Sequence, residues 1–327
     1  MHTLTSTKSF AIKQSLRKSG FKEPLEMLGI MMLFILGVVM FPTRRIVQFF
    51  YHGDKEWVFW LADGIQRLLF SVMMLRFVFN FGFRIWAKKV RFTGLLVVVP
   101  ALIIATNNFP FVSYFMGESE LACSKEELIS FTVWCLGVGI FEELSFRGII
   151  LPLVHILIHE SPRWRVKIKQ ADGAVSVKIK KRTKKHAVFF TVAFSSAIFA
   201  LTHLVNIFNG NIGGTIVQIG YTFLIGAMCG IVTVKTGNVA LAALVHFVYN
   251  FCGMLIEYCG KGVMWTWQQI VCTASVGVVI GVIMIIIVYL ADRSPELTFG
   301  MLGDGAEEAL AAVPRKKRKT PKTRKNA

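Results

Sequence analysis

The sequence predicts an all-α membrane protein with about eight transmembrane helices and both termini in the cytoplasm. Three observations predict this fold: the composition, the length of the apolar stretches and the uneven placement of the basic residues. Of the 327 residues, 54% are hydrophobic and only 17% are charged, and the mean hydropathy is +0.57. A soluble chain of this length would need more charge to cover its surface, so the composition excludes a soluble globular protein.

Eight apolar stretches reach the roughly 17 to 25 residues with which a helix crosses a bilayer. They cover residues 25–41, 57–81, 94–113, 127–158, 187–208, 212–234, 238–257 and 266–291. The first stretch follows a basic region, as in a signal peptide. It is too long for one, however, and no small-residue cleavage site follows it, so we interpret it as an uncleaved first helix.

These stretches and the segments between them divide the chain into five parts. The parts are a basic cytoplasmic tail (1–24), N-terminal transmembrane helices (25–113), a core (127–260) with a basic cytoplasmic insertion (159–186), a last transmembrane helix (266–291) and a second basic tail (292–327), which we expect to be disordered.

The basic residues set the predicted orientation. The net charge of +18 collects in the two tails and in residues 84–91 and 159–186, which eight helices would place on one side. The opposite side receives an acidic loop at 118–127. By the positive-inside rule the basic side is cytoplasmic. We expect the basic segments to contact anionic lipid headgroups, an interpretation that we prefer to nucleic-acid binding.

The basic insertion has a pattern of its own. Residues 165–181 alternate apolar and basic side chains on both sides of an Asp-Gly pair at 172–173, which favours a two-residue turn. Such a turn would pair Ile168 with Val177 and Val166 with Ile179. We therefore predict a small cytoplasmic β-hairpin at 165–180, with a solvated basic loop as the alternative.

Ionisable side chains inside the apolar stretches are few, and each needs a partner or a function. In the second stretch Asp63 and Arg67 are four residues apart, where they can neutralise each other, and we interpret this pair as structural. In the fourth stretch Glu143 and Arg147 have the same spacing and can form an ion pair. Glu142 lies about 100° away around that helix and has no basic partner on it.

Further polar residues lie on two other stretches. His203 stands alone on the fifth, while His246 and Asn250 share one face of the seventh. Singly, each could be a packing group or an interhelical hydrogen bond. Together with Glu142, two imidazoles and an amide on separate helices favour a catalytic chamber inside the membrane.

These residues form three motifs in order: EExxxR from residue 142, FxxxH from residue 199 and HxxxN from residue 246. The motifs resemble those of the CPBP family over about residues 127–260. This family comprises intramembrane proteases similar to type II CAAX prenyl endopeptidases and to bacterial abortive-infection and bacteriocin-immunity proteins. Even EELSFRG at 142–148 is similar to the family's extended first motif.

The resemblance implies hydrolysis of a peptide bond in a membrane-embedded or lipidated peptide or protein. Glu142 with His203 would activate a water as general base. His246 and Asn250 would donate hydrogen bonds to the tetrahedral oxyanion. Arg147 would hold Glu143 and fix the helix.

A zinc ion held by Glu142, His203 and His246 is the alternative to this chemistry. The sequence has no His-Glu-x-x-His motif, and the asparagine of the third motif is a poor zinc ligand. We therefore favour a glutamate mechanism without a metal or other cofactor.

Two other functional classes fit the same residues. The buried charges could form the pathway of an ion- or proton-coupled transporter, although the sequence shows no internal repeat. The chain could also be a catalytically silent immunity or scaffold protein. We favour the protease, as a multi-pass protein of a bacterial cell membrane.

Overall fold

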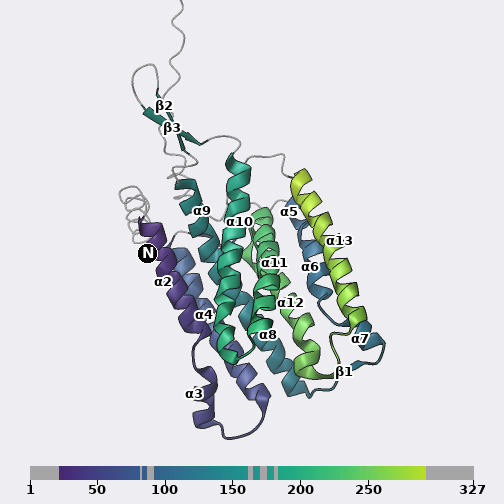
Figure 1. Cartoon of the computed structure of the whole chain (residues 1–327). Coiled ribbons are helices and arrows are strands. Elements are labelled where there is room, and N and C mark those ends of the chain that lie inside the picture. Colours follow the sequence, from purple (N-terminus) through teal and green to yellow (C-terminus); the bar gives the residue numbers. More distant parts are fainter. Residues whose placement is uncertain are drawn as a thin grey trace, which may run out of the picture.

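The structure is a computed structural model that describes residues 22–81, 83–86, 92–160, 165–169, 175–179 and 183–291. The described part is a bundle of long helices with two small two-stranded sheets (Figure 1). The long helices are α2 (Lys22–Val39), α4 (Glu56–Asn80), α8 (Lys125–Ser145), α9 (Leu151–Glu160), α10 (Thr183–Thr202), α11 (Ile212–Thr236), α12 (Val239–Cys259) and α13 (Trp267–Ala291). The predicted all-α architecture is confirmed.

Within the described residues, seven helical segments are long and apolar enough to cross a membrane. They are Leu25–Phe50, Glu56–Asn80, Lys125–His155, Phe189–Phe208, Ile212–Thr236, Val239–Cys259 and Trp267–Met284. The first of these includes the short helix α3 (Thr43–Phe50) after α2. Seven of the eight predicted stretches therefore form long helices, and the protein is an integral, multi-pass membrane protein.

The eighth predicted stretch, 94–113, is broken. It forms α5 (Phe92–Leu95), α6 (Val98–Thr106) and α7 (Phe111–Phe115), which together still run from one end of the bundle to the other (Figure 1). Two prolines explain the breaks, because a proline lacks the N–H that bonds four residues back and its ring clashes with that carbonyl. Pro100 lies four residues after position 96, just beyond the end of α5 at Leu95. Pro110 lies four residues after Thr106, the last residue of α6.

The predicted β-hairpin forms, but in another register. Strands β2 (Arg165–Lys169) and β3 (Val175–Ile179) are antiparallel, and Val166 pairs with Lys178 and Ile168 with Ser176. The predicted pairs were therefore wrong by one residue. This register leaves five residues between the strands rather than two, and the predicted turn at 172–173 lies outside the described residues, as do the tails 1–21 and 292–327.

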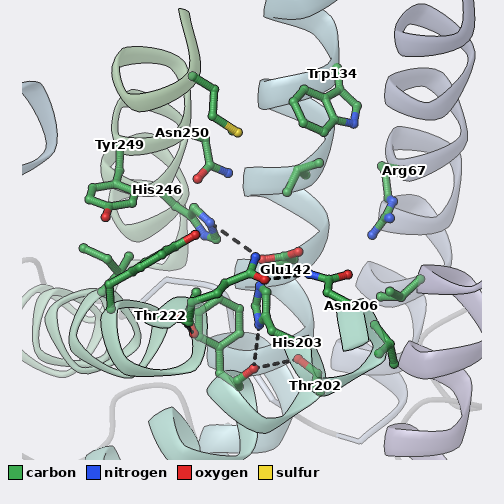
Figure 2. Close-up of a pocket in the computed structure, with 18 of the residues that line it drawn as sticks. Arg67, Trp134, Glu142, Thr202, His203, Asn206, Thr222, His246, Tyr249 and Asn250 are labelled. Atoms are coloured by element: carbon green, nitrogen blue, oxygen red, sulfur yellow. Dashed lines mark hydrogen bonds and ion pairs between the residues drawn. The ribbon is translucent and has the colours of Figure 1, made fainter. Parts of the chain in front are cut away.

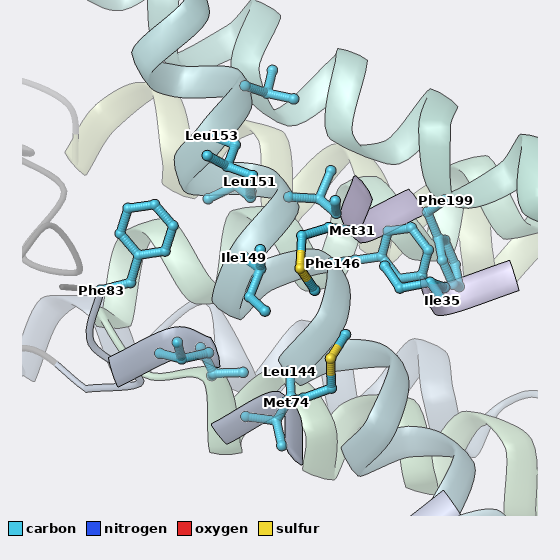
Figure 3. Close-up of a cluster of buried hydrophobic side chains, with 14 of the residues drawn as sticks. Met31, Ile35, Met74, Phe83, Leu144, Phe146, Ile149, Leu151, Leu153 and Phe199 are labelled. Carbon is cyan, nitrogen blue, oxygen red and sulfur yellow. The ribbon is translucent and has the colours of Figure 1, made fainter. Parts of the chain in front are cut away.

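One turn of π-helix interrupts the long helix of the core. It is η1 (Phe146–Ile150), between α8 and α9, and it follows directly on the glutamates of the first motif. The extra residue of a π-turn is a feature often found at functional sites. Its side chains enter a buried apolar cluster with residues of α2, α4 and α10 (Figure 3).

A two-stranded clip joins the ends of α8 and α12. Strand β1 (Ser119–Leu121) precedes α8, and it pairs antiparallel with β4 (Gly260–Gly262), which follows α12. Ser124 then starts α8 with a capping box: its hydroxyl accepts from the N–H of Glu127, whose carboxylate accepts from the N–H of Ser124. The start of α8 is thus fixed against the end of α12.

Candidate active site

The three motifs meet at one cavity of about 230 Å³ (Figure 2). Its wall is formed by side chains of α4, α8, α10, α11, α12 and the 3₁₀ segment η3 (His203–Asn209). Of the motif residues, Glu142, Phe199, His203, His246 and Asn250 line it.

Two glycines bring α8 close to both of its neighbours. A Cβ on Gly137 would lie 2.5 Å from the carbonyl oxygen of Gly64 on α4. A Cβ on Gly139 would lie 3.3 Å from the carbonyl oxygen of Ala243 on α12. Residues two apart point about 200° apart around a helix, so α8 packs between α4 and α12. The glutamates that follow one turn later therefore face α12 at the level of His246.

Glu143 and Arg147 form the predicted ion pair, fully buried behind the cavity. Arg147 Nη1 lies 3.0 Å from Glu143 Oε1, and both side chains are at most 1% exposed. Arg147 Nη2 also donates to the carbonyl oxygen of Gly226 on α11 at 2.7 Å. Its guanidinium carbon lies 4.8 Å from the centre of the Phe199 ring, a cation–π contact. From η1, Arg147 thus ties Glu143 on α8 to α10 and α11.

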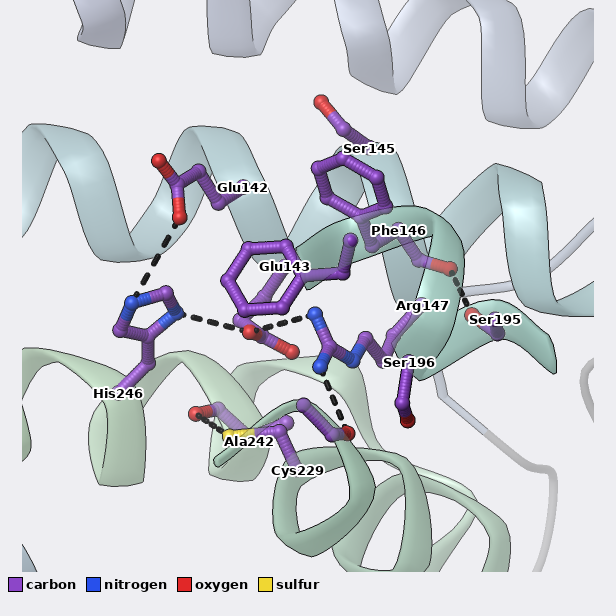
Figure 4. Close-up of polar contacts among 12 residues, drawn as sticks. Glu142, Glu143, Ser145, Phe146, Arg147, Ser195, Ser196, Cys229, Ala242 and His246 are labelled. Atoms are coloured by element: carbon purple, nitrogen blue, oxygen red, sulfur yellow. Dashed lines mark hydrogen bonds and ion pairs between the residues drawn. The ribbon is translucent and has the colours of Figure 1, made fainter. Parts of the chain in front are cut away.

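His246 is the partner that the sequence did not predict for Glu143. Its Nδ1 lies 2.8 Å from Glu143 Oε1, so one carboxylate oxygen binds both Arg147 and His246 (Figure 4). A carboxylate paired with an arginine only accepts hydrogen bonds, so Nδ1 carries a proton. From the sequence we expected Arg147 to hold Glu143 and did not predict this second bond, because we considered partners on the same helix only.

Glu142 lies on the other side of the same imidazole. Its Oε2 is 3.6 Å from His246 Nε2, and its side chain is 13% exposed, toward the cavity. With Nδ1 protonated, a neutral His246 has only a lone pair at Nε2, and an ionised carboxylate has only lone pairs as well. The two groups attract each other when one proton sits between them, on Nε2 or on Glu142. At 3.6 Å the contact is an ion pair when His246 is protonated and is too long for a hydrogen bond.

His203 is oriented by its own helix. Its Nδ1 lies 3.1 Å from the carbonyl oxygen of Phe199, and a carbonyl can only accept, so this nitrogen carries the proton. In neutral His203 the other nitrogen, Nε2, is then an acceptor. The ring lies on the cavity wall, where α10 tightens into η3. The structure thus brings His203 to the same cavity as Glu142 and His246.

The remaining walls are polar on the side of α11 and η3. Asn206 Nδ2 donates to Gln218 Oε1 at 2.8 Å, so these two amides bind each other. Asn250 lies one turn beyond His246 on α12, and its amide reaches the same cavity (Figure 2).

The sequence did not assign α4 to the site. Asp63 and Arg67, which we interpreted as a structural pair, both line the cavity. Their spacing gave no indication of this, because it specifies a helix face and not the neighbour of that face. The glycine at position 64, between the two charged residues, was the available signal, since it permits close packing.

The described residues do not fit a metal site in their present arrangement. Among the parts of the chain that the structure describes, no three His, Cys, Asp or Glu side chains converge so that they could hold an ion. No step proposed below therefore runs through a metal.

Comparison with known proteins gives one match. Residues 124–252 match the family described as type II CAAX prenyl endopeptidase Rce1-like. The search of curated proteins and the search of solved structures gave no match. The matched segment runs from the cap of α8 to the last turns of α12 and contains all three motifs. This match confirms the resemblance seen in the sequence and indicates a CAAX-protease-like intramembrane endopeptidase. Over this segment, which is about two fifths of the chain, the protein is similar to the Rce1-like type II CAAX prenyl endopeptidases.

Proposed function

We propose that the chain hydrolyses a peptide bond of a membrane-embedded or lipidated substrate in this cavity, with Glu142 as the general base and without a metal. One observation supports this most. Both imidazoles use Nδ1–H for a fixed acceptor, Phe199 O for His203 and Glu143 for His246. Each Nε2 is thereby left for the cavity that Glu142 also lines. Two oriented nitrogens and a carboxylate around one space suit the activation of a water.

In the first step, a water between Glu142 and His203 attacks the carbonyl carbon of the scissile bond. Glu142 accepts one proton of the water, and Nε2 of neutral His203 accepts a hydrogen bond from the other O–H. The new C–O bond forms as the carbonyl π electrons move to the oxygen. His203 thus orients the water, and Glu142 takes its proton.

His246 stabilises the oxyanion only when its Nε2 is protonated, which refines the role expected from the sequence. At rest the carboxylate of Glu142 balances this charge across 3.6 Å. Once Glu142 has taken a proton it is neutral, and the negative charge now lies on the substrate oxygen. The Nε2–H of His246 then donates a hydrogen bond to this oxygen, and the amide of Asn250 supplies a second donor.

In the second step, the tetrahedral intermediate collapses and the C–N bond breaks. The proton held by Glu142 passes to the leaving amine, which returns the glutamate to its ionised form. The products are a carboxylic acid and an amine, so the atoms and charges of the hydrolysis balance. Arg147 and Glu143 do not touch the substrate; they position His246.

Cleavage by the purified full-length protein in lipid vesicles tests this proposal. The matched family is that of CAAX prenyl endopeptidases, so an internally quenched prenylated peptide is the first substrate to assay. Glu142→Gln keeps the size of the side chain and removes the base, so we expect the turnover number to fall by a factor on the order of 10² or more. Normal turnover by this variant, confirmed by mass spectrometry of the products, would contradict the proposal.

A chelator separates the glutamate mechanism from a metal mechanism. We expect incubation with 1,10-phenanthroline, followed by its removal, to leave the rate unchanged. Loss of activity that added Zn²⁺ restores would show that Glu142 and the two histidines act as ligands instead.

A further inference from the structure

The cavity contains a fixed cation that the proposed hydrolysis does not use. Among the described residues that line the cavity, Arg67 is the sole lysine or arginine. It comes from α4, which lies outside the segment that matches the family. Figure 2 shows its guanidinium directed into the space that Glu142 borders.

The guanidinium of Arg67 is poorly satisfied by its neighbours. Its nearest acid is Asp63, whose Oδ1 lies 3.9 Å from Nε, beyond hydrogen-bond distance. Asp63 is held elsewhere, because its Oδ2 accepts from the indole N–H of Trp134 at 2.8 Å. Nε is buried without a hydrogen-bond partner, although the whole side chain is only 11% exposed. A guanidinium with so few acceptors in a mostly buried position favours an anionic ligand.

Packing holds this arginine in place. Gly64 on α4 approaches α8 so closely that a Cβ would lie 2.8 Å from the backbone of Trp134. One face of the guanidinium lies over the ring of Phe141, with 5.6 Å from its carbon to the ring centre. Asp63 approaches the Nε side, and among the described residues no acid is paired with the edge formed by the two terminal nitrogens. This edge can bind the two oxygens of a carboxylate in parallel.

We propose that Arg67 binds the free C-terminal carboxylate of the substrate and so selects peptides that end inside the cavity. This proposal rests on the proposed hydrolysis at Glu142. Arg67 and Glu142 line the same cavity, so a carboxylate bound at Arg67 would place the end of the chain close to the general base. A carboxylate is also the anion that a peptide end carries at neutral pH. Arg67 is thus a specificity-determining residue for this reaction.

Paired substrates test the proposal without any variant. Two internally quenched peptides of one sequence, one with a free C-terminal acid and one with a carboxamide, are compared in lipid vesicles. A charge-assisted contact is expected to make kcat/KM higher for the acid by roughly 10- to 100-fold, mainly through KM. Equal values for the two peptides would overturn the proposal.

Substitution of Arg67 assigns that preference to the residue. In Arg67→Gln the ratio of the two kcat/KM values should fall to about one, and Arg67→Lys should keep part of the preference through its point charge. The matched control is Arg76→Gln, an exposed arginine on the same helix, which should leave the ratio as in the wild type. A preference that persists in Arg67→Gln, or an equal loss for both peptides in Arg67→Gln and Arg67→Lys, would contradict the assignment.

Two further arms identify the carboxylate and separate this proposal from the hydrolysis itself. A carboxamide peptide with an added glutamate near its end should behave like the plain carboxamide; if it behaves like the acid, Arg67 binds a side chain and not the terminus. Binding of labelled acid and amide peptides to the Glu142→Gln variant, measured by fluorescence anisotropy, needs no turnover. Preferential binding of the acid there supports the role of Arg67 even if Glu142 is not the base.

Discussion

Two pairs in this molecule have the same chemistry and the same spacing, yet they differ in almost every contact. Asp63 and Arg67 on α4 lie 3.9 Å apart, whereas Glu143 on α8 and Arg147 on η1 lie 3.0 Å apart. The second pair is at most 1% exposed, and the first is 11% to 30% exposed. Spacing along the helix therefore does not decide whether an acid and an arginine neutralise each other.

The difference comes from third partners on neighbouring helices. Around Glu143 and Arg147, His246 from α12 and the carbonyl of Gly226 from α11 complete the arrangement. In the α4 pair, Asp63 instead accepts a hydrogen bond from the indole N–H of Trp134 on α8. One pair is thus closed and serves as a support for His246, and the other is open and leaves Arg67 available to a ligand.

Removing the acid of the closed pair should have the largest effect. Glu143→Gln leaves the guanidinium of Arg147 buried without a counter-charge, at a cost of about 3–5 kcal/mol of folding stability. The yield of monodisperse protein in detergent and its thermal midpoint measure this. Glu142→Gln is the matched variant, because Glu142 is the adjacent residue on the same helix, is more exposed than Glu143 and lies outside the Glu143–Arg147 pair. This variant should keep a normal yield. If the two variants lost equal yield, the closed pair would not be the stabilising one.

A methyl group added beside Arg147 should have an intermediate effect. In Gly226→Ala the new Cβ would lie 2.9 Å from Phe199 Cδ1 and 3.3 Å from Arg147 Nη2. Overpacking of this kind costs about 1–3 kcal/mol. Gly220→Ala on the same helix is the control, because nothing lies within 4 Å of its Cβ, and it should leave the thermal midpoint unchanged or raise it. An unchanged midpoint in Gly226→Ala would mean that the pair of Glu143 and Arg147 tolerates a shift of the α11 backbone beside it.

Neutralising the acid of the open pair should have the smallest effect on folding. Asp63→Asn keeps an acceptor for Trp134 and removes a charge that Arg67 only weakly contacts, so the stability should change by less than about 1 kcal/mol. Because less negative charge would then face Arg67, KM for the acid-ended peptide should fall. A loss of stability as large as that of Glu143→Gln would show that both pairs are closed.

The sequence predicts those features that depend on one helix at a time. Lengths of apolar residues identified seven of the long helices, and the i, i+4 spacing identified the ion pair of Glu143 with Arg147. Motif order also identified the residues that the structure brings to one cavity. Each of these follows from the geometry of a single helix or from similarity to a family.

Contacts between helices could not be predicted in the same way. The bond from His246 to Glu143 depends on how closely α8 and α12 cross, which Gly139 sets through its missing side chain. The place of Arg67 in the cavity depends likewise on Gly64 and Gly137. Sequence spacing gives the face on which a side chain lies, but the neighbour of that face follows only from packing in three dimensions.

Local backbone chemistry accounts for the other differences. Apolar content alone made 94–113 look like one helix, although Pro100 and Pro110 each remove a backbone donor within it. In the hairpin, alternation predicted two strands correctly but could not fix their register, because a shift of one residue preserves the alternation of each strand.

The clip between β1 and β4 has a mechanical consequence. It fixes one end of α12 to the start of α8, so a tilt of α12 relative to α8 pivots about that end. His246 lies 14 residues before Gly260, which is about 21 Å along the helix at 1.5 Å per residue. A tilt of about 5° around the clip then displaces the imidazole by about 2 Å, which is enough to break its 2.8 Å bond to Glu143. A small change in the angle between α12 and α8 is therefore enough to make or break the hydrogen bond between His246 and Glu143.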